Sequence, residues 1–150
     1  MNSKLQNFLI EERINYISLP HSVAIPAQKV AQVAHISGNS MAKTVIVSAD
    51  GVITMSILPA STRLDLDDLK KTMGAKKVRL AKEYEFRDLF PDCEVGAMPP
   101  FGNLYEMNVF VSKKLASEEH IYFNAGNHSE IVRLSYTDFD NAVHPVLADI

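Results

Sequence analysis

A tight turn between two strand-like runs is the feature that most constrains the fold of this chain. Residues 43–48 and 52–58 are dominated by β-branched and other apolar side chains, and Asp50-Gly51 lies between them. The Asp-Gly pair readily adopts the positive φ angles of a two-residue hairpin turn. The pattern therefore predicts an antiparallel hairpin, and we expect this pair of strands near the centre of a sheet.

Strand-like and helix-like segments alternate along the rest of the chain. Apolar spacing and terminal residues predict helices at 4–12, 65–73, 82–90 and 135–143, and a further helix that starts at Pro26 and ends before Gly38. Further strands are predicted at 16–19, 108–112, 120–123 and 130–134. No repeat, low-complexity tract or linker divides the sequence, so residues 1–150 are predicted to form a single mixed α/β (α+β) domain. We expect a mixed, mainly antiparallel central sheet flanked by helices.

Composition restricts the class of protein. With 150 residues and 47% hydrophobic side chains, the chain is long enough to form one core without a disulfide or a structural metal. It has one cysteine, Cys93, a polar start at Met1 to Lys4, and no apolar run long enough to span a bilayer, so we expect a cytoplasmic protein with no membrane role. The formal net charge of −3 argues against binding along DNA or any nucleic acid, and any RNA contact should be local.

One basic cluster departs from this acidic balance. Its members are Lys70, Lys71, Lys76, Lys77, Arg79 and Lys82. Such a cluster could meet a phosphate backbone, or it could be the solvated end of a helix.

A loop bounded by glycines is the first candidate for chemistry. It consists of Gly96, Ala97, Met98, Pro99, Pro100, Phe101 and Gly102. The two prolines stiffen the backbone and the glycines permit unusual dihedral angles, so the loop could present fixed N–H donors to an ester carbonyl or a developing oxyanion. The same composition is also typical of a rigid turn that only connects strands.

Two further candidates are a histidine beside a glycine and a lysine at the start of a strand. Gly126 and His128 lie between two predicted strands, where the histidine could be a base, a hydrogen-bond donor, a pocket wall or a surface residue. Lys43 heads an apolar strand, and its ammonium could bind a phosphate or end the strand in solvent.

Other kinds of site have little support in the sequence. Cys93 has no CxxC partner and the five histidines show no ligand spacing, so no metal site is predicted. The six glycines form neither a P-loop nor a dinucleotide fingerprint, and no serine lies in a nucleophile elbow, so we expect no cofactor and no covalent serine catalysis. A catalytic Cys93 has no local signature, and packing is its expected role.

The ordered set of motifs resembles the YbaK family of prolyl-tRNA-synthetase-associated editing domains. The resemblance rests on Ala-Lys-Thr-Val-Ile-Val at 42–47, Gly-Ala-Met-Pro-Pro-Phe-Gly at 96–102 and Phe-Asn-Ala-Gly-Asn-His at 123–128. It extends to Ala-His-Ile-Ser-Gly at 34–38 and Leu-Asp-Leu at 64–66, and so covers nearly the whole chain. The absence of synthetase sequence implies the free-standing form of the family.

What the resemblance implies is hydrolysis of the ester between a wrong amino acid and the acceptor end of a transfer RNA. Lys43, Gly96 and His128 match the family's functional positions, and the rest of the loop with Gly126 would bind the substrate. Lys43 would hold a phosphate or the ester end, the loop amides would bind the carbonyl, and His128 would shape the pocket. The family is expected to use water, assisted by the substrate itself, rather than a strong base.

The implied substrate is a small residue such as alanine, cysteine or serine on tRNA for proline, with a prolyl-tRNA synthetase as a possible partner. Editing of this kind is needed because a synthetase separates side chains that differ by one methylene by only about 1–3 kcal/mol. Ile25-Pro26 stands where many members carry a hydroxyl-bearing residue, which leaves the choice of amino acid open. The alternative function is a catalytically silent module that binds an aminoacyl or nucleotide end beside a synthetase.

Overall fold

The computed structural model describes residues 1–20 and 36–150. The helical elements are α1 (Ser3–Glu11), α3 (Leu66–Met73), α4 (Glu83–Phe86), η1 (Arg87–Leu89), η2 (Gly102–Tyr105), α5 (Lys113–Ala116) and α6 (Tyr136–Val143). The strands are β1 (Ile17–Pro20), β2 (Ala42–Ala49), β3 (Val52–Pro59), β4 (Val78–Leu80), β5 (Val109–Ser112), β6 (His120–Asn124), β7 (Glu130–Ser135) and β8 (Val146–Ala148). The predicted helix that starts at Pro26, and the Ile25-Pro26 position, lie outside the described residues.

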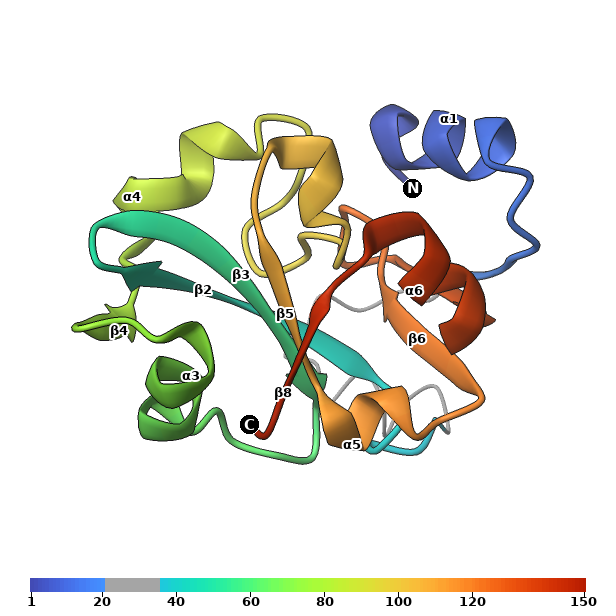
Figure 1. Ribbon diagram of the computed structural model, residues 1–150. Helices are drawn as coiled ribbons and strands as arrows, with labels where there is room; N and C mark the ends of the chain where they lie inside the picture. Colours follow the sequence, from blue (N-terminus) through green and yellow to red (C-terminus); the bar gives the residue numbers. More distant parts are fainter. Residues whose placement is uncertain (21–35) are drawn as a thin grey trace.

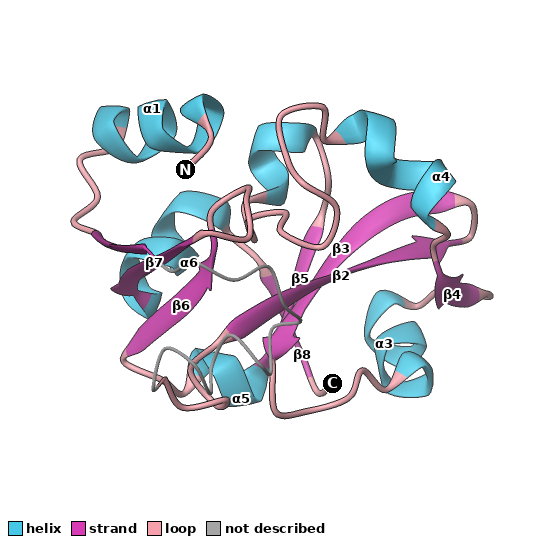
Figure 2. Ribbon diagram, turned by 180° about the vertical axis from the view of Figure 1, so that it is seen from behind, coloured by secondary structure: helices cyan, strands magenta, loops and turns pink. Residues whose placement is uncertain are grey.

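The strands form two sheets, shown from opposite sides in Figures 1 and 2. The larger sheet has the order β4-β2-β3-β5-β8, and the smaller has the order β1-β7-β6. β3 pairs with β5 and β5 with β8 in parallel, whereas the other pairs are antiparallel. Among the described residues, a bridge between Met41 and Tyr122 connects the sheets. The mixed, mainly antiparallel α/β fold is thus confirmed, with its strands divided between two sheets.

The β2–β3 hairpin lies in the middle of the larger sheet, as predicted. Its register pairs Ala49 with Val52 at the turn and Lys43 with Leu58 near the other end. Asp50 and Gly51 both have positive φ, at 51° and 84°. The Asp-Gly pair therefore supplies the turn geometry that the sequence indicated.

Capping residues set the helix ends. The Asp65 side chain accepts a hydrogen bond from the Asp68 amide at the start of α3, and Gly74 ends that helix with a φ of 65°. Ser135 caps α6 in the same way by accepting from the Asp138 amide. The helix predicted over 82–90 is one short turn, α4, followed by the 3-10 helix η1.

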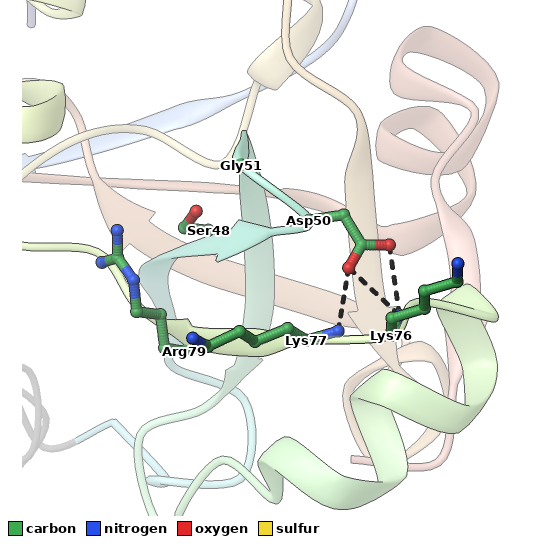
Figure 3. Close-up of a pocket in the computed structure, with 6 residues that line it drawn as sticks. All are labelled: Ser48, Asp50, Gly51, Lys76, Lys77 and Arg79. Carbon is green, nitrogen blue, oxygen red and sulfur yellow. Dashed lines mark hydrogen bonds between the residues drawn. The ribbon is translucent and has the colours of Figure 1, made fainter.

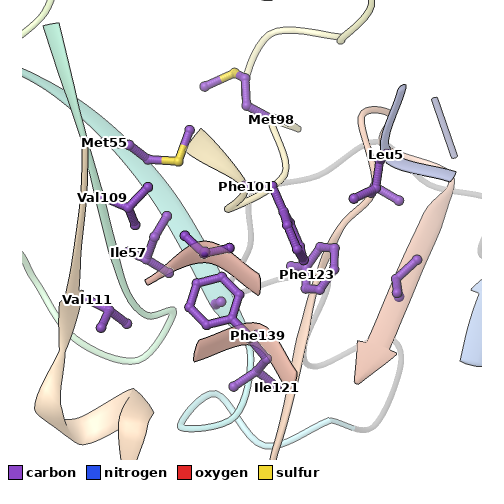
Figure 4. Packing of buried hydrophobic residues seen from close by; sticks show 14 of the residues in the cluster. Leu5, Met55, Ile57, Met98, Phe101, Val109, Val111, Ile121, Phe123 and Phe139 are labelled. Carbon is purple, nitrogen blue, oxygen red and sulfur yellow. The ribbon is translucent and has the colours of Figure 1, made fainter. Parts of the chain in front are cut away.

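A cluster of aromatic rings lies at the centre of the main core (Figure 4). Phe101 is fully buried, with its ring centroid 5.8 Å from that of Phe8, 5.5 Å from Phe123 and 5.6 Å from Phe139. These rings come from the glycine-bounded loop, α1, β6 and α6. Met55 and Ile57 of β3 belong to the same cluster, so one core joins both sheets. A second cluster containing Val47 and Leu69 packs α3 against the other face of the larger sheet.

Candidate active site

The two glycine segments pack directly on each other. The Gly126 amide donates to the Ala97 carbonyl at 2.9 Å, and the Glu94 amide donates to the Gly126 carbonyl at 2.8 Å. A Cβ on Gly96 would lie 3.4 Å from Cε1 of His128. Residues that are about 30 positions apart in the sequence thus lie in direct contact.

Both glycines in this contact need backbone freedom. Gly96 has a φ of 84° and Gly126 a φ of 93°, a region that side-chain-bearing residues rarely adopt. A Cβ on Gly126 would also lie 2.8 Å from Nδ2 of Asn2. Glycine is therefore required there by both dihedral angle and space.

His128 is held by its backbone and by its ring. Its amide donates to the Glu94 carboxylate at 3.2 Å, and its Nε2 lies 2.8 Å from the Val95 carbonyl. A carbonyl only accepts, so Nε2 carries the proton in this contact and Nδ1 is left as an acceptor in the neutral ring. Nδ1 is buried and has no hydrogen-bond partner among the described residues. The ring atoms beside Gly96 are Cε1 and Nε2, so His128 packs against this glycine while Nδ1 is enclosed by the protein.

The loop from Gly96 to Gly102 is largely buried. Ala97 to Gly102 are buried, and the Phe101 ring anchors the loop in the core. The Ala97 amide donates to the Glu94 carbonyl at 3.0 Å, whereas the amides of Gly96 and Met98 donate to no other described residue. Gly96 is exposed and Met98 is 6% exposed, so their amides are the donors of this loop that a bound carbonyl could use.

Thr44, the residue after Lys43 on β2, contacts the glycine-bounded loop, whereas the Lys43 ammonium does not. Thr44 Oγ1 donates to the Met98 carbonyl at 2.9 Å, which fastens β2 to the loop. Successive side chains on a strand point to opposite faces, and the Lys43 ammonium donates instead to the Thr62 carbonyl. The structure thus brings the loop, Gly126 and His128 together, while the Lys43 ammonium lies on the other side of β2.

The surroundings of Lys43 favour an anion. Burial lowers the pKa of its ammonium, and the nearby Arg63 guanidinium lowers that pKa further. Neither cation makes an ion pair within the part of the chain that the structure describes. Two adjacent cations without a carboxylate partner can bind a phosphate or another negatively charged group.

Cys93 is part of a hydrogen-bonded cluster. Its Sγ lies 3.2 Å from Asn2 Nδ2 and 3.3 Å from the Tyr105 hydroxyl, and Asn2 Nδ2 also donates to Asp92 at 3.1 Å. Burial raises the pKa of the Cys93 thiol to about 11, so it is protonated at neutral pH. A protonated thiol is a poor nucleophile, and the cluster instead ties α1 to the loop that precedes Gly96.

Sequence reasoning missed four residues around these segments: Asn2, Thr44, Arg63 and Glu94. Asn2 had a detectable signal, because Asn is a preferred helix N-cap and its side chain does accept from the Leu5 amide. The other three depend on contacts with residues distant in the sequence, for which no local pattern exists.

Within the described residues, no three His, Cys, Asp or Glu side chains gather in a group that could hold a metal ion. The helices in that same part of the chain include none that is long and apolar enough to cross a membrane.

Comparisons with known proteins point to one family. Residues 21–142 match the family model described as aminoacyl-tRNA editing domain. No curated protein matches the chain significantly.

Solved structures share the fold. A hypothetical protein has 23% identity and a TM-score of 0.87 over 98% of both chains. A candidate trans-editing enzyme for prolyl tRNA synthetase has 19% identity and a TM-score of 0.81 over 97% of this chain and 93% of that one. A candidate signal transduction protein from Marinobacter aquaeolei VT8 contains the fold in 30% of its length, with 16% identity, a TM-score of 0.78 and all of this chain covered. With most of its length matched by the family model, the chain belongs to the aminoacyl-tRNA editing domain family, in agreement with the YbaK resemblance.

Proposed function

We infer that this protein is a trans-acting deacylase that hydrolyses the ester of mischarged tRNA. The observation that carries this inference is the packing of Gly126 and His128 on the Gly96–Gly102 loop, in a chain of the editing family. The proposed substrates are small amino acids, with alanine first and cysteine or serine next, on tRNA for proline. A prolyl-tRNA synthetase is the proposed partner, and the cytoplasm is the proposed compartment.

The loop would act by positioning rather than by attack. Amides of Gly96 and Met98 adjoin the buried part of the loop, so they could stabilise charge on the ester carbonyl without reorganising. The thiol of Cys93 is protonated and hydrogen-bonded, which leaves water as the proposed nucleophile. The ribose hydroxyl or amino group of the substrate would help to activate that water.

His128 and Lys43 have different proposed roles. His128 would form a wall of the pocket, because the Val95 carbonyl fixes its ring through Nε2. Lys43, with Arg63 beside it, would hold a phosphate of the terminal nucleotide. The binding free energy at that phosphate would keep the ester in place for hydrolysis.

Purified protein incubated with a panel of mischarged tRNAs tests the proposal. We expect accelerated deacylation of the small amino acids, and a loss of about tenfold to a hundredfold in kcat/KM for Lys43→Ala, because the substrate loses its anchor. Lys113→Ala, which removes an exposed lysine in α5, is the matched control and should act as wild type. Deacylation of every substrate at the spontaneous rate would refute the enzyme, and tight tRNA binding in that case would support the silent binding module.

A further inference from the structure

The basic cluster identified in the sequence forms a surface at the far end of β2 from Lys43. A cavity of about 580 Å³ lies there, lined by Ser48, Asp50, Gly51, Lys76, Lys77 and Arg79 (Figure 3). It is formed where the β2–β3 turn meets the loop between α3 and β4. None of these residues belongs to the candidate active site.

Asp50 fixes the shape of this surface. One carboxylate oxygen accepts from the Lys77 amide at 2.8 Å, and both accept from the Lys76 amide at 3.1 Å. The Asp50 amide in turn donates to the Lys77 carbonyl at 2.8 Å. The lysine loop is thus fastened to the hairpin through its backbone, and both lysine side chains extend away from the carboxylate (Figure 3).

The two lysine ammonium groups retain their charge for a partner. Lys76 and Lys77 are exposed, and neither side chain makes an ion pair or hydrogen bond within residues 1–20 and 36–150. Arg79, in contrast, forms a two-pronged pair with Glu85 at 2.7 and 2.9 Å. Residues 70–85 contain six cations and two carboxylates, although the chain as a whole has a net charge of −3. Positive charge is therefore concentrated on this surface.

The distance to Lys43 indicates which part of a tRNA would reach this surface. Asp50 directly follows β2 and comes seven residues after Lys43, which corresponds to about 23 Å at about 3.3 Å per residue. Stacked nucleotides rise by about 3.4 Å each along one strand, so this span is about seven nucleotides. A phosphate of the terminal nucleotide at Lys43 would put the first base pairs of the acceptor stem, beyond the unpaired end, at the lysine surface.

We propose that Lys76 and Lys77 bind the phosphate backbone of the tRNA acceptor stem, at a surface separate from the ester site. The choice of tRNA as the ligand rests on the proposed function. The choice of this surface rests on its positive charge, its exposure and its fixed backbone. Backbone contacts of this kind position a nucleic acid without reading its sequence. The surface would therefore serve any tRNA whose acceptor end fits the ester site.

Binding of uncharged tRNA tests the surface without requiring hydrolysis. For Lys76→Ala/Lys77→Ala we expect about tenfold weaker binding of full-length tRNA, and a salt dependence of log Kd smaller by about two in slope. The matched control is Lys113→Ala/Lys114→Ala, a second exposed lysine pair that should bind nearly as wild type. Because Asp50 binds the backbone at 76 and 77, the alanine variant should keep its fold, which circular dichroism checks.

A short probe separates this surface from the ester site. An oligonucleotide restricted to the unpaired 3′ end should bind the double variant and the wild type equally, because it cannot reach the lysines. The proposal would be overturned if the double variant bound the short probe as weakly as it binds full-length tRNA. It would also be overturned if the control pair lost as much affinity for full-length tRNA as the double variant. Unchanged binding of full-length tRNA would also overturn it and would point to an acidic protein surface as the partner. If binding falls as expected but no mischarged tRNA is hydrolysed, the surface stands and the deacylase does not.

Discussion

Gly126 shows how closely a single residue can be constrained. Its φ of 93° excludes most side chains, and a Cβ would meet Asn2, whose amide is already held by Asp92, Cys93 and Tyr105. We expect Gly126→Ala to lower the free energy of unfolding by about 2–3 kcal/mol, from backbone strain and from displacement of Asn2. Urea unfolding measures this loss.

Gly51→Ala is the matched control, because Gly51 has a similar φ of 84° but no atom within 4 Å of the added Cβ. Its expected loss is about 1 kcal/mol, from strain alone. Equal losses at the two glycines would show that the approach of Asn2 imposes no constraint.

Cys93 supplies a prediction about pH. Its thiol has a pKa of about 11, raised mainly by burial, so the folded state holds the proton more tightly than the unfolded chain does. The associated stability is present below the unfolded pKa near 9 and is lost as pH rises towards 11. At pH 8, native Cys93 should react with iodoacetamide about a hundredfold more slowly than in urea, because its thiolate fraction is that much smaller. Mass spectrometry follows the reaction, and equal rates in the two states would contradict the assignment.

Among the structural elements, the loop from Gly96 to Gly102 depends on one aromatic anchor. Phe101 contacts rings from three other parts of the chain and is fully buried. Phe101→Ala should lower the free energy of unfolding by about 3–5 kcal/mol. Tyr84→Ala, at a ring that is 65% exposed, should change it by less than about 0.5 kcal/mol. A small loss at Phe101, measured by urea unfolding, would mean that the loop is not held by the core.

The elements also show what can be predicted from a sequence. The β2–β3 hairpin and α3 were predictable because Asp50-Gly51, Asp65 and Gly74 carry local signals for a turn, a cap and a stop. The strands β4 and β8 were not predicted, because each has three residues and is defined by its neighbour in the sheet rather than by its own pattern. Short strands of this kind form only when a partner strand is already in place.

The candidate site was predictable only as an ordered set of segments. Their packing against each other depends on Gly126, which donates to Ala97, and that contact joins distant parts of the sequence. The sequence also did not predict that the Lys43 ammonium donates to Thr62 and lies near Arg63. That arrangement depends on how β2 and the segment after β3 run in space. Local patterns carry no information about such pairings.

At the scale of the whole molecule, the two sheets share one core. Ile57 and Val111 from the larger sheet belong to the same buried cluster as Ile121 and Val132 from the smaller one. We therefore expect a single cooperative unfolding transition. Hydrogen exchange measured on peptides of β3 and β7 should give the same free energy of global opening. Separate values, with the smaller sheet opening first, would show that the two sheets are independent units.

The alternation of Lys43 and Thr44 along β2 has a consequence for how such a chain can evolve. Thr44 holds the loop through Met98 on one side of the strand, while Lys43 contacts Thr62 on the other. Insertion or deletion of one residue before this pair would exchange the two sides, because side chains alternate with a period of two. Lineages of this domain should therefore preserve the spacing between Met41 and Thr44.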